Sequence, residues 1–160
     1  MNCKRLIPTP LGTLYAECSE RGITLLSFEE NPSEEAIENQ PASHPYLLQL
    51  ESELDEYFSR RRTQFELPLD PRGTEFQLKV WQSLLAIPFG STCSYLQQSK
   101  VLGDPKAIRA VAHANGQNKI AILIPCHRVL GSDGSLTGYA GKLWRKKFLL
   151  ELESTQRSLF

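Results

Sequence analysis

Hydrophobic and polar positions follow two different periods along this 160-residue chain. Residues 11–18 and 23–28 alternate apolar and polar side chains around a turn at 19–22, which predicts two adjacent β-strands. After residue 43 the period changes to three or four, which predicts a helix capped by Ser43 and ending near Ser59. The apolar face of this helix consists of Leu47, Leu50, Leu54 and Tyr57.

The rest of the chain has mostly helical patterns. Thr74 and Gln77 match the capping box of a helix N-terminus, and the Pro-Phe-Gly segment at 88–90 ends that helix. We expect its inner face to consist of Phe76, Val80, Leu84 and Ile87. A final helix is predicted from Lys142 to about Glu153. Its expected inward residues are Trp144, Phe148 and Leu152.

Two short helices lie between these elements. Ser94 and Gln97 form a second capping box, which predicts a helix ending near Val101. A Leu-Gly turn follows, and Asp104 with Pro105 predicts the start of a helix over 106–114. Helix, short glycine turn and helix is the pattern of a helix-turn-helix. Arg109 projects from the second helix, among small residues that would let a partner approach closely: Ala107, Ala110, Ala112 and Ala114. Such units also serve as plain scaffolding, so DNA binding stays open on this pattern alone.

Charge divides the chain into two parts although the formal net charge is zero. Residues 1–71 contain 6 basic and 13 acidic side chains, whereas residues 72–153 contain 11 basic and 5 acidic ones. The switch coincides with a linker-like segment at 70–73, which predicts domains at 1–71 and 72–160. The basic second part indicates an anionic partner.

Composition narrows the cellular setting. No apolar run approaches the roughly 20 residues that cross a bilayer, and no signal-peptide pattern begins the chain, so we expect no membrane association. The four cysteines are irregularly spaced and form no zinc-ligand pattern. We therefore expect a reduced, cytoplasmic protein without a metal.

The candidate chemistry lies in Pro125-Cys126-His127-Arg128-Val129. It follows the apolar run 120–124, which should be buried, so a thiol and an imidazole stand at the edge of a core. A thiolate is the reactive form of cysteine, and nearby His or Arg increases its population. Adjacent side chains diverge, so a water-bridged pair is the easier geometry. Free cysteine also packs as a small hydrophobe, and the dipeptide alone leaves both interpretations open.

Together these motifs resemble the O6-alkylguanine-DNA alkyltransferases. The likeness covers about residues 74–153 and rests on Pro-Cys-His-Arg-Val after Ile-Leu-Ile, the Gly-Tyr-x-Gly at 138–141, the segment 106–111 and Asn118. A weaker match lies at 9–12. The resemblance implies an α+β protein, with an N-terminal ribonuclease H-like α/β domain and a mostly helical C-terminal domain with a helix-turn-helix.

The family's activity would then be direct repair of DNA. Cys126 would accept the alkyl group from O6-alkylguanine irreversibly, and less readily from O4-alkylthymine. By the same resemblance, His127 would remove the thiol proton through a water, and Glu153 would orient His127. Tyr95 would donate a proton or hydrogen bond to guanine N3.

The remaining expected site residues contact substrate or DNA. Arg109 would fill the space of a flipped nucleotide, and Ala110 would lie in the minor groove of double-stranded DNA. Asn118 would connect the helix-turn-helix to the active-site turn, and Tyr139 would wall the pocket. Further substrate-binding positions are Ser94, Val129 and Gly141.

Several positions depart from the family pattern. Asn118 is followed by Lys119, where the pair Asn-Pro is usual, Ile108 replaces a common alanine, and Ala140 replaces a serine of some relatives. Cys18 is offset from the zinc ligands of some relatives, so the resemblance implies no metal or other cofactor. We expect a monomer, and cooperative binding to DNA stays open.

Three alternatives remain at this point. A non-catalytic sensor of alkylated DNA would carry another residue, commonly tryptophan, at position 126. A Cys-His hydrolase would require an oxyanion hole and would have no use for a helix-turn-helix with Arg109. A plain helix-turn-helix regulator leaves residues 125–129 unexplained.

Overall fold

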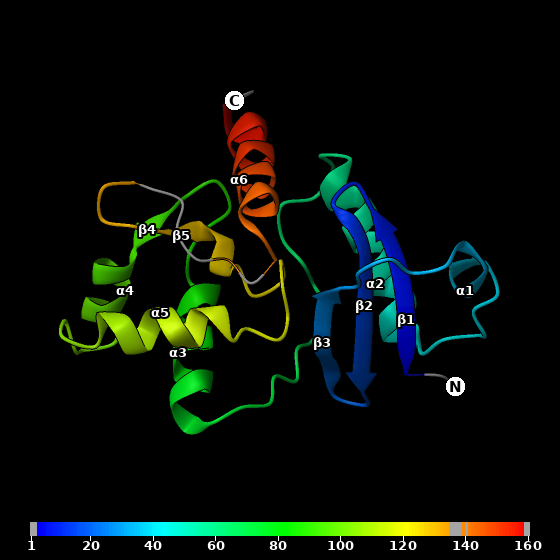
Figure 1. Cartoon of the computed structure of the whole chain (residues 1–160), viewed down its shortest axis with the longest axis horizontal. Helices are drawn as coiled ribbons and strands as arrows, with labels where there is room; N and C mark the ends of the chain where they lie inside the picture. Colours follow the sequence, from blue (N-terminus) through cyan, green and yellow to red (C-terminus); the bar gives the residue numbers. More distant parts are fainter. Residues whose placement is uncertain (1–2, 135–138, 140, 159–160) are drawn as a thin grey trace. The chain divides into compact units, whose positions relative to one another are not determined.

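The computed structural model describes residues 3–134, 139 and 141–158, which form two compact units, Met1–Arg72 and Gly73–Phe160 (Figure 1). The predicted residues Gly138 and Ala140 lie outside the described part. None of the helices described is long and apolar enough to cross a membrane.

The N-terminal unit is a three-stranded antiparallel sheet with two helices. Its strands are β1 (Lys4–Thr9), β2 (Gly12–Ser19) and β3 (Gly22–Phe28), in the order β1-β2-β3. The structure confirms the predicted hairpin at 19–22 and adds β1, which the alternation did not reveal. The edge of β1 is protected by Gln40, whose side chain accepts from Leu6 N and donates to Leu6 O.

Two helices complete this unit, the short α1 (Glu34–Glu38) and the longer α2 (Pro45–Phe58). The four predicted apolar residues of α2 are all buried and form its contact with the sheet. The predicted cap is wrong by one residue. His44, not Ser43, caps α2, because Pro45 has no N–H and the His44 Nδ1 atom accepts from Tyr46 N at 3.1 Å.

The C-terminal unit begins with α3 (Glu75–Leu85) and continues through β4 (Cys93–Ser94), α4 (Tyr95–Val101) and α5 (Ile108–Gly116). Both predicted capping boxes are present, at the N-termini of α3 and α4. The inner face of α3 differs from the prediction. Trp81 is buried with Val80 and Leu84, whereas Phe76 is exposed.

The helix-turn-helix consists of α4 and α5, separated by a turn in which Gly103 has a φ of 89°. The predicted start of α5 is wrong. Asp104 accepts from Lys106 N and so closes a separate turn, while the helix itself begins at Ile108 without a side-chain cap. A buried pair of reciprocal amide hydrogen bonds, at 2.9 and 2.7 Å, joins Gln98 of α4 to Asn115 of α5. This pair fixes the angle between the two helices.

The chain then passes through a 3₁₀ turn, η1 (Cys126–Arg128), into β5 (Val129–Leu130) and ends in α6 (Leu143–Ser158). Strand β5 pairs in parallel with β4, with Val129 opposite Cys93. Of the three predicted inward residues of α6, Leu152 is buried as expected, whereas Trp144 and Phe148 are exposed. The inward residues of the helix are Arg145, Lys146, Leu149, Leu152 and Glu153. Arg145, Lys146 and Glu153 are charged, and Lys146 and Glu153 belong to the site described next.

Candidate active site

The approach to Cys126 is a tightly turned backbone, not a regular element. Leu123 N donates to Ala121 O at 2.8 Å around Ile122, and Cys126 N donates to Ile124 O at 2.8 Å. These are two three-residue turns, and Ile122 has a φ of 71°. A β-branched residue rarely adopts this conformation. The apolar run is buried as predicted, except for the half-buried Ala121, and it ends at Pro125.

Asn118 holds this turn in place. Its Nδ2 atom donates to Ile124 O at 2.8 Å and to the Cys126 Sγ atom at 3.3 Å, while its Oδ1 atom accepts from Ile120 N at 3.0 Å. Asn118 lies two residues after α5. It therefore links the end of that helix to the sulfur atom, and its amide donor favours the thiolate form.

Several opposing effects act on the Cys126 thiol. Burial raises its pKa, while the Asn118 amide, the positive charge of Lys146 and a backbone hydrogen bond lower it. The net direction is upward, so Cys126 is a protonated thiol at rest. Its reactivity then depends on a base that takes the proton.

His127 is placed beside this thiol and is completely buried. Its Nε2 atom lies 2.8 Å from Glu153 Oε2, and its Nδ1 atom is buried without a hydrogen-bond partner. Burial lowers the pKa of His127, Glu153 raises it, and the charges of Arg128 and Lys146 lower it further; the net direction is downward, so the ring is neutral near pH 7. Because ionised Glu153 can only accept, the proton of the neutral ring is on Nε2. Nδ1 is then the atom that can accept a proton.

Glu153 also forms an ion pair with Arg128. The Arg128 Nε atom donates to Oε1 at 2.8 Å and the second guanidinium nitrogen to Oε2 at 3.1 Å. Burial opposes ionisation of Glu153, but hydrogen bonds and charge from His127 and Arg128 lower its pKa to about 2. The carboxylate is therefore charged and held in one orientation. Only spacing distinguished Glu153 from Glu151 in the sequence, and the structure leaves Glu151 exposed.

Tyr95 and Tyr139 bring two hydroxyl groups to this part of the unit. Tyr95 is positioned by the pairing of β4 with β5, because it directly follows Ser94, and Lys146 Nζ lies 5.9 Å from the centre of its ring. The Tyr139 hydroxyl is buried without a hydrogen-bond partner, and burial raises its pKa well above the usual value. Lys146, whose side chain is completely buried, was not expected from the sequence.

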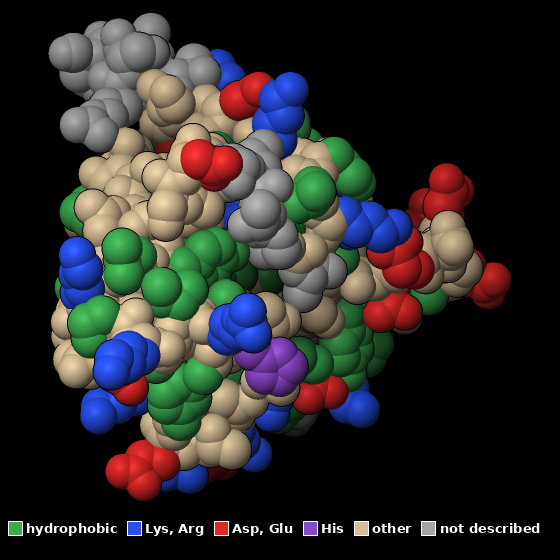
Figure 2. Space-filling view, turned by 60° about the vertical axis from the view of Figure 1, so that its left-hand side comes forward, with side chains coloured by type: hydrophobic (Ala, Val, Ile, Leu, Met, Phe, Trp, Pro, Cys, Tyr) green, Lys and Arg blue, Asp and Glu red, His purple; other side chains and the backbone are tan. Residues whose placement is uncertain are grey.

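The other predicted contacts lie on α5 and in the segments around it. Arg109 and Ala110 are exposed on α5. Ala114 is buried and its carbonyl accepts a 2.9 Å hydrogen bond from Trp81, so it cannot meet an external partner as predicted. Among the remaining positions, Ser94 caps α4, Val129 is buried in β5 and Gly141 lies before α6. Figure 2, which brings the C-terminal unit forward, shows Lys and Arg among surface hydrophobic side chains.

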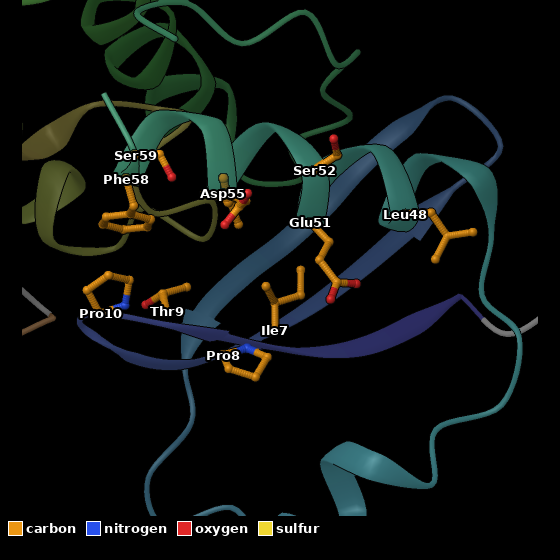
Figure 3. A pocket seen from close by; sticks show the side chains of 11 residues that line it. Ile7, Pro8, Thr9, Pro10, Leu48, Glu51, Ser52, Asp55, Phe58 and Ser59 are labelled. Carbon is orange, nitrogen blue, oxygen red and sulfur yellow. The ribbon is translucent and has the colours of Figure 1, made fainter. Parts of the chain in front are cut away.

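A separate cavity of about 490 Å³ lies in the N-terminal unit between β1 and α2 (Figure 3). Pro8, Pro10 and Phe58 form its apolar wall, and two carboxylates lie along it. Glu51 pairs with Arg5, and exposed Asp55 pairs with Arg61. The described residues that line the cavity include neither a cysteine nor a histidine. Within the described part of the chain, no cluster of His, Cys, Asp or Glu could hold a metal ion.

Fold and site together define a helix-turn-helix protein in which Asn118 contacts a cysteine thiol and the next residue, His127, is paired with Glu153. Comparison with known proteins names the family. Residues 75–155 match the DNA-binding domain of 6-O-methylguanine DNA methyltransferase, and residues 2–71 match the ribonuclease-like domain of the same protein. The chain belongs to this family.

Individual relatives are similar over nearly the whole chain. A methylated-DNA–protein-cysteine methyltransferase of Methanosarcina barkeri is 43% identical over 153 residues, covering 92% of this chain and 94% of the relative. The constitutive enzyme of Bacillus subtilis is 42% identical over 158 residues, with 96% of each chain covered. The crystal structure of Mycobacterium tuberculosis O6-methylguanine methyltransferase aligns with a TM-score of 0.84 at 41% identity, over 98% of this chain and 94% of that one. A structure of the same organism's protein in complex with DNA aligns equally well, with a TM-score of 0.84.

Proposed function

We propose that this protein repairs alkylated DNA by moving the alkyl group from O6 of guanine to the Cys126 sulfur, once per protein molecule. Its family and its relatives are methyltransferases of methylated DNA. The observation that supports the residue assignment is the hydrogen bond from the Asn118 amide to Cys126 Sγ at 3.3 Å, together with the His127–Glu153 pair, which begins at the next residue of the chain.

The first step is activation of the thiol. The His127 Nδ1 atom accepts the Cys126 proton through a bridging water, because neighbouring side chains diverge. The imidazolium that forms is stabilised by Glu153 at 2.8 Å, and the thiolate is stabilised by the Asn118 amide and the nearby Lys146 charge. The two charges appear together, so the buried site stays balanced.

The second step is group transfer. The thiolate attacks the alkyl carbon in line, a C–S bond forms, and the C–O6 bond breaks with its electron pair moving into the purine. Tyr95 delivers a proton or hydrogen bond to guanine N3, which makes the base a better leaving group. The product is a thioether, which water does not cleave, so Cys126 is consumed.

DNA is bound through the helix-turn-helix. A base inside a stacked duplex cannot be reached by a sulfur that is half-buried in the protein, so the target nucleotide must rotate out of the helix. Exposed Arg109, in the first turn of α5, is placed to occupy the space it leaves, and exposed Ala110 allows close approach to the minor groove. Tyr139, Val129, Ser94 and Gly141 would line the pocket for the base. One chain holds all these residues, so the protein would act as a monomer.

The test uses duplex DNA with one O6-methylguanine and mass spectrometry of the intact protein and its peptides. One methyl group per protein, on the peptide with Cys126, is expected, with no further turnover in excess DNA. Cys126→Ala should repair nothing, and Cys93→Ala, which removes another half-buried thiol, should repair normally. Methylation of Cys3, Cys18 or Cys93 in the wild-type protein would contradict the assignment.

A further inference from the structure

Arg128 has no part in the activation step proposed above, although it contacts Glu153 directly. The side chain is buried and fully engaged at its polar end. Two of its nitrogens bind both oxygens of Glu153, and the third donates to Ile87 O at 2.7 Å, just beyond α3. A single guanidinium therefore connects the catalytic turn, α6 and the end of α3.

This arrangement restricts Glu153 geometrically. Its Oε2 atom accepts from His127 Nε2 at 2.8 Å and from Arg128 at 3.1 Å, while Oε1 accepts from Arg128 Nε at 2.8 Å. A bidentate Arg–carboxylate pair fixes the plane of the carboxylate, which a lysine cannot do. The direction of the hydrogen bond to His127 is set by the same contact.

Arg128 also changes the balance of charge around His127. The charged groups that act on the ring are Glu153 and Lys146 from α6 and Arg128 from η1, with Cys126 as the adjacent titratable group. Glu153 favours the imidazolium, and both cations oppose it. If His127 were already an imidazolium at rest, it could not accept the thiol proton. Glu153 without Arg128 would favour that charged form and so would make His127 a poorer base.

We propose that Arg128 is a positioning residue for alkyl transfer: it orients Glu153 on His127 and keeps the resting imidazole neutral, ready to accept the Cys126 proton. The proposal rests on the function proposed above. Arg128 would contribute in two ways, through its bidentate contact with Glu153 and through its positive charge near His127, and different substitutions separate the two.

Two variants and one control measure these contributions in single-turnover transfer from methylated duplex DNA at saturating protein, between pH 5 and 9. Arg128→Met removes both the bidentate contact and the positive charge. We expect a lower maximal transfer rate, and we expect the fall in rate at acid pH to begin about one pH unit higher than in the wild-type protein. Arg128→Lys retains the charge without the bidentate contact, and we expect a plateau about tenfold lower with an unshifted acid limb. Lys147→Met removes an exposed charge of α6 and should change neither.

A purely structural Arg128 would lower the plateau and the melting temperature without moving the acid limb of Arg128→Met, and that result would overturn the proposal. If Arg128→Met does not fold, Arg128→Gln takes its place, and NMR titration of the three histidine rings in that variant and in the wild-type protein decides. His127 must take up its second proton at a pH about one unit higher in the variant, and an unchanged titration would equally overturn the proposal. The titration needs no DNA, so it still tests Arg128 if the transfer assay shows that another residue accepts the methyl group.

Discussion

Replacing Glu153 with glutamine should destabilise the protein in a pH-dependent way. The pKa of Glu153 lies at about 2, compared with 4.5 for an ordinary glutamate. Because the folded-state pKa is depressed, the ionised carboxylate stabilises the fold above pH 4.5, and this stabilisation is lost as the pH falls toward 2. A shift of this size corresponds to about 3 kcal/mol at neutral pH, as an order of magnitude.

Glutamine is the appropriate substitution because it has nearly the shape of a protonated glutamic acid. The wild-type protein and Glu153→Gln should therefore converge at low pH, where the wild-type side chain is itself neutral. At pH 7 the variant leaves the buried Arg128 guanidinium without a counter-charge, which is a strongly destabilising change.

The assay is urea unfolding of both proteins at intervals between pH 2 and 8. The difference in free energy of unfolding should be about 3 kcal/mol above pH 5 and should shrink steadily toward zero near pH 2. Glu151→Gln changes an exposed glutamate of α6, two residues before Glu153, and should show no comparable trend. A constant difference between wild type and Glu153→Gln over this range would refute the assignment of a depressed pKa.

Four further outcomes are expected. Asn118→Asp should slow methyl transfer about 100-fold and raise the pKa of Cys126, because a carboxylate would face the thiolate; the rate of iodoacetamide alkylation against pH measures the latter. Arg109→Ala should slow transfer from duplex DNA about tenfold but leave reaction with the free O6-alkylguanine base unchanged, and equal losses would remove its role in flipping. Trp81→Phe should lower the free energy of unfolding by about 1–2 kcal/mol in urea, through loss of the bond to Ala114 O. Methylated protein should melt about 2–10 °C lower than the free protein by calorimetry, because the added methyl overpacks a fitted site.

Local chemistry explains which elements could be predicted from the sequence. The capping boxes at Thr74 and Ser94 involve residues three apart, and the stripe of α2 has a simple period, so both appear in the structure. The errors arose where a residue's surroundings are distant in sequence. Phe76 and Phe148 were assigned to the core by hydrophobicity alone, although other side chains of α3 and α6 occupy it.

The candidate site shows the same division. The Pro125–Val129 motif located the thiol and the imidazole, and the family resemblance supplied Glu153 and Asn118. Lys146 was missed because a lysine in a helix is normally solvated, and its contact with Tyr95 depends on folding. The Arg128–Glu153 pair spans 25 residues and could not be deduced from spacing.

The network around Cys126 links the sulfur to the helix that carries Arg109. Asn118 follows α5 by two residues and binds both the sulfur and the turn at Ile124. A methyl group on Sγ must occupy space near the Asn118 amide, which lies only 3.3 Å away, and a thioether is a poorer acceptor than a thiolate. If Cys126 accepts the alkyl group, as proposed, methylation should weaken the hydrogen bond from Asn118 Nδ2 to Sγ. Because Asn118 lies two residues after α5, we expect this loss to affect the helix-turn-helix as well as the methylated site.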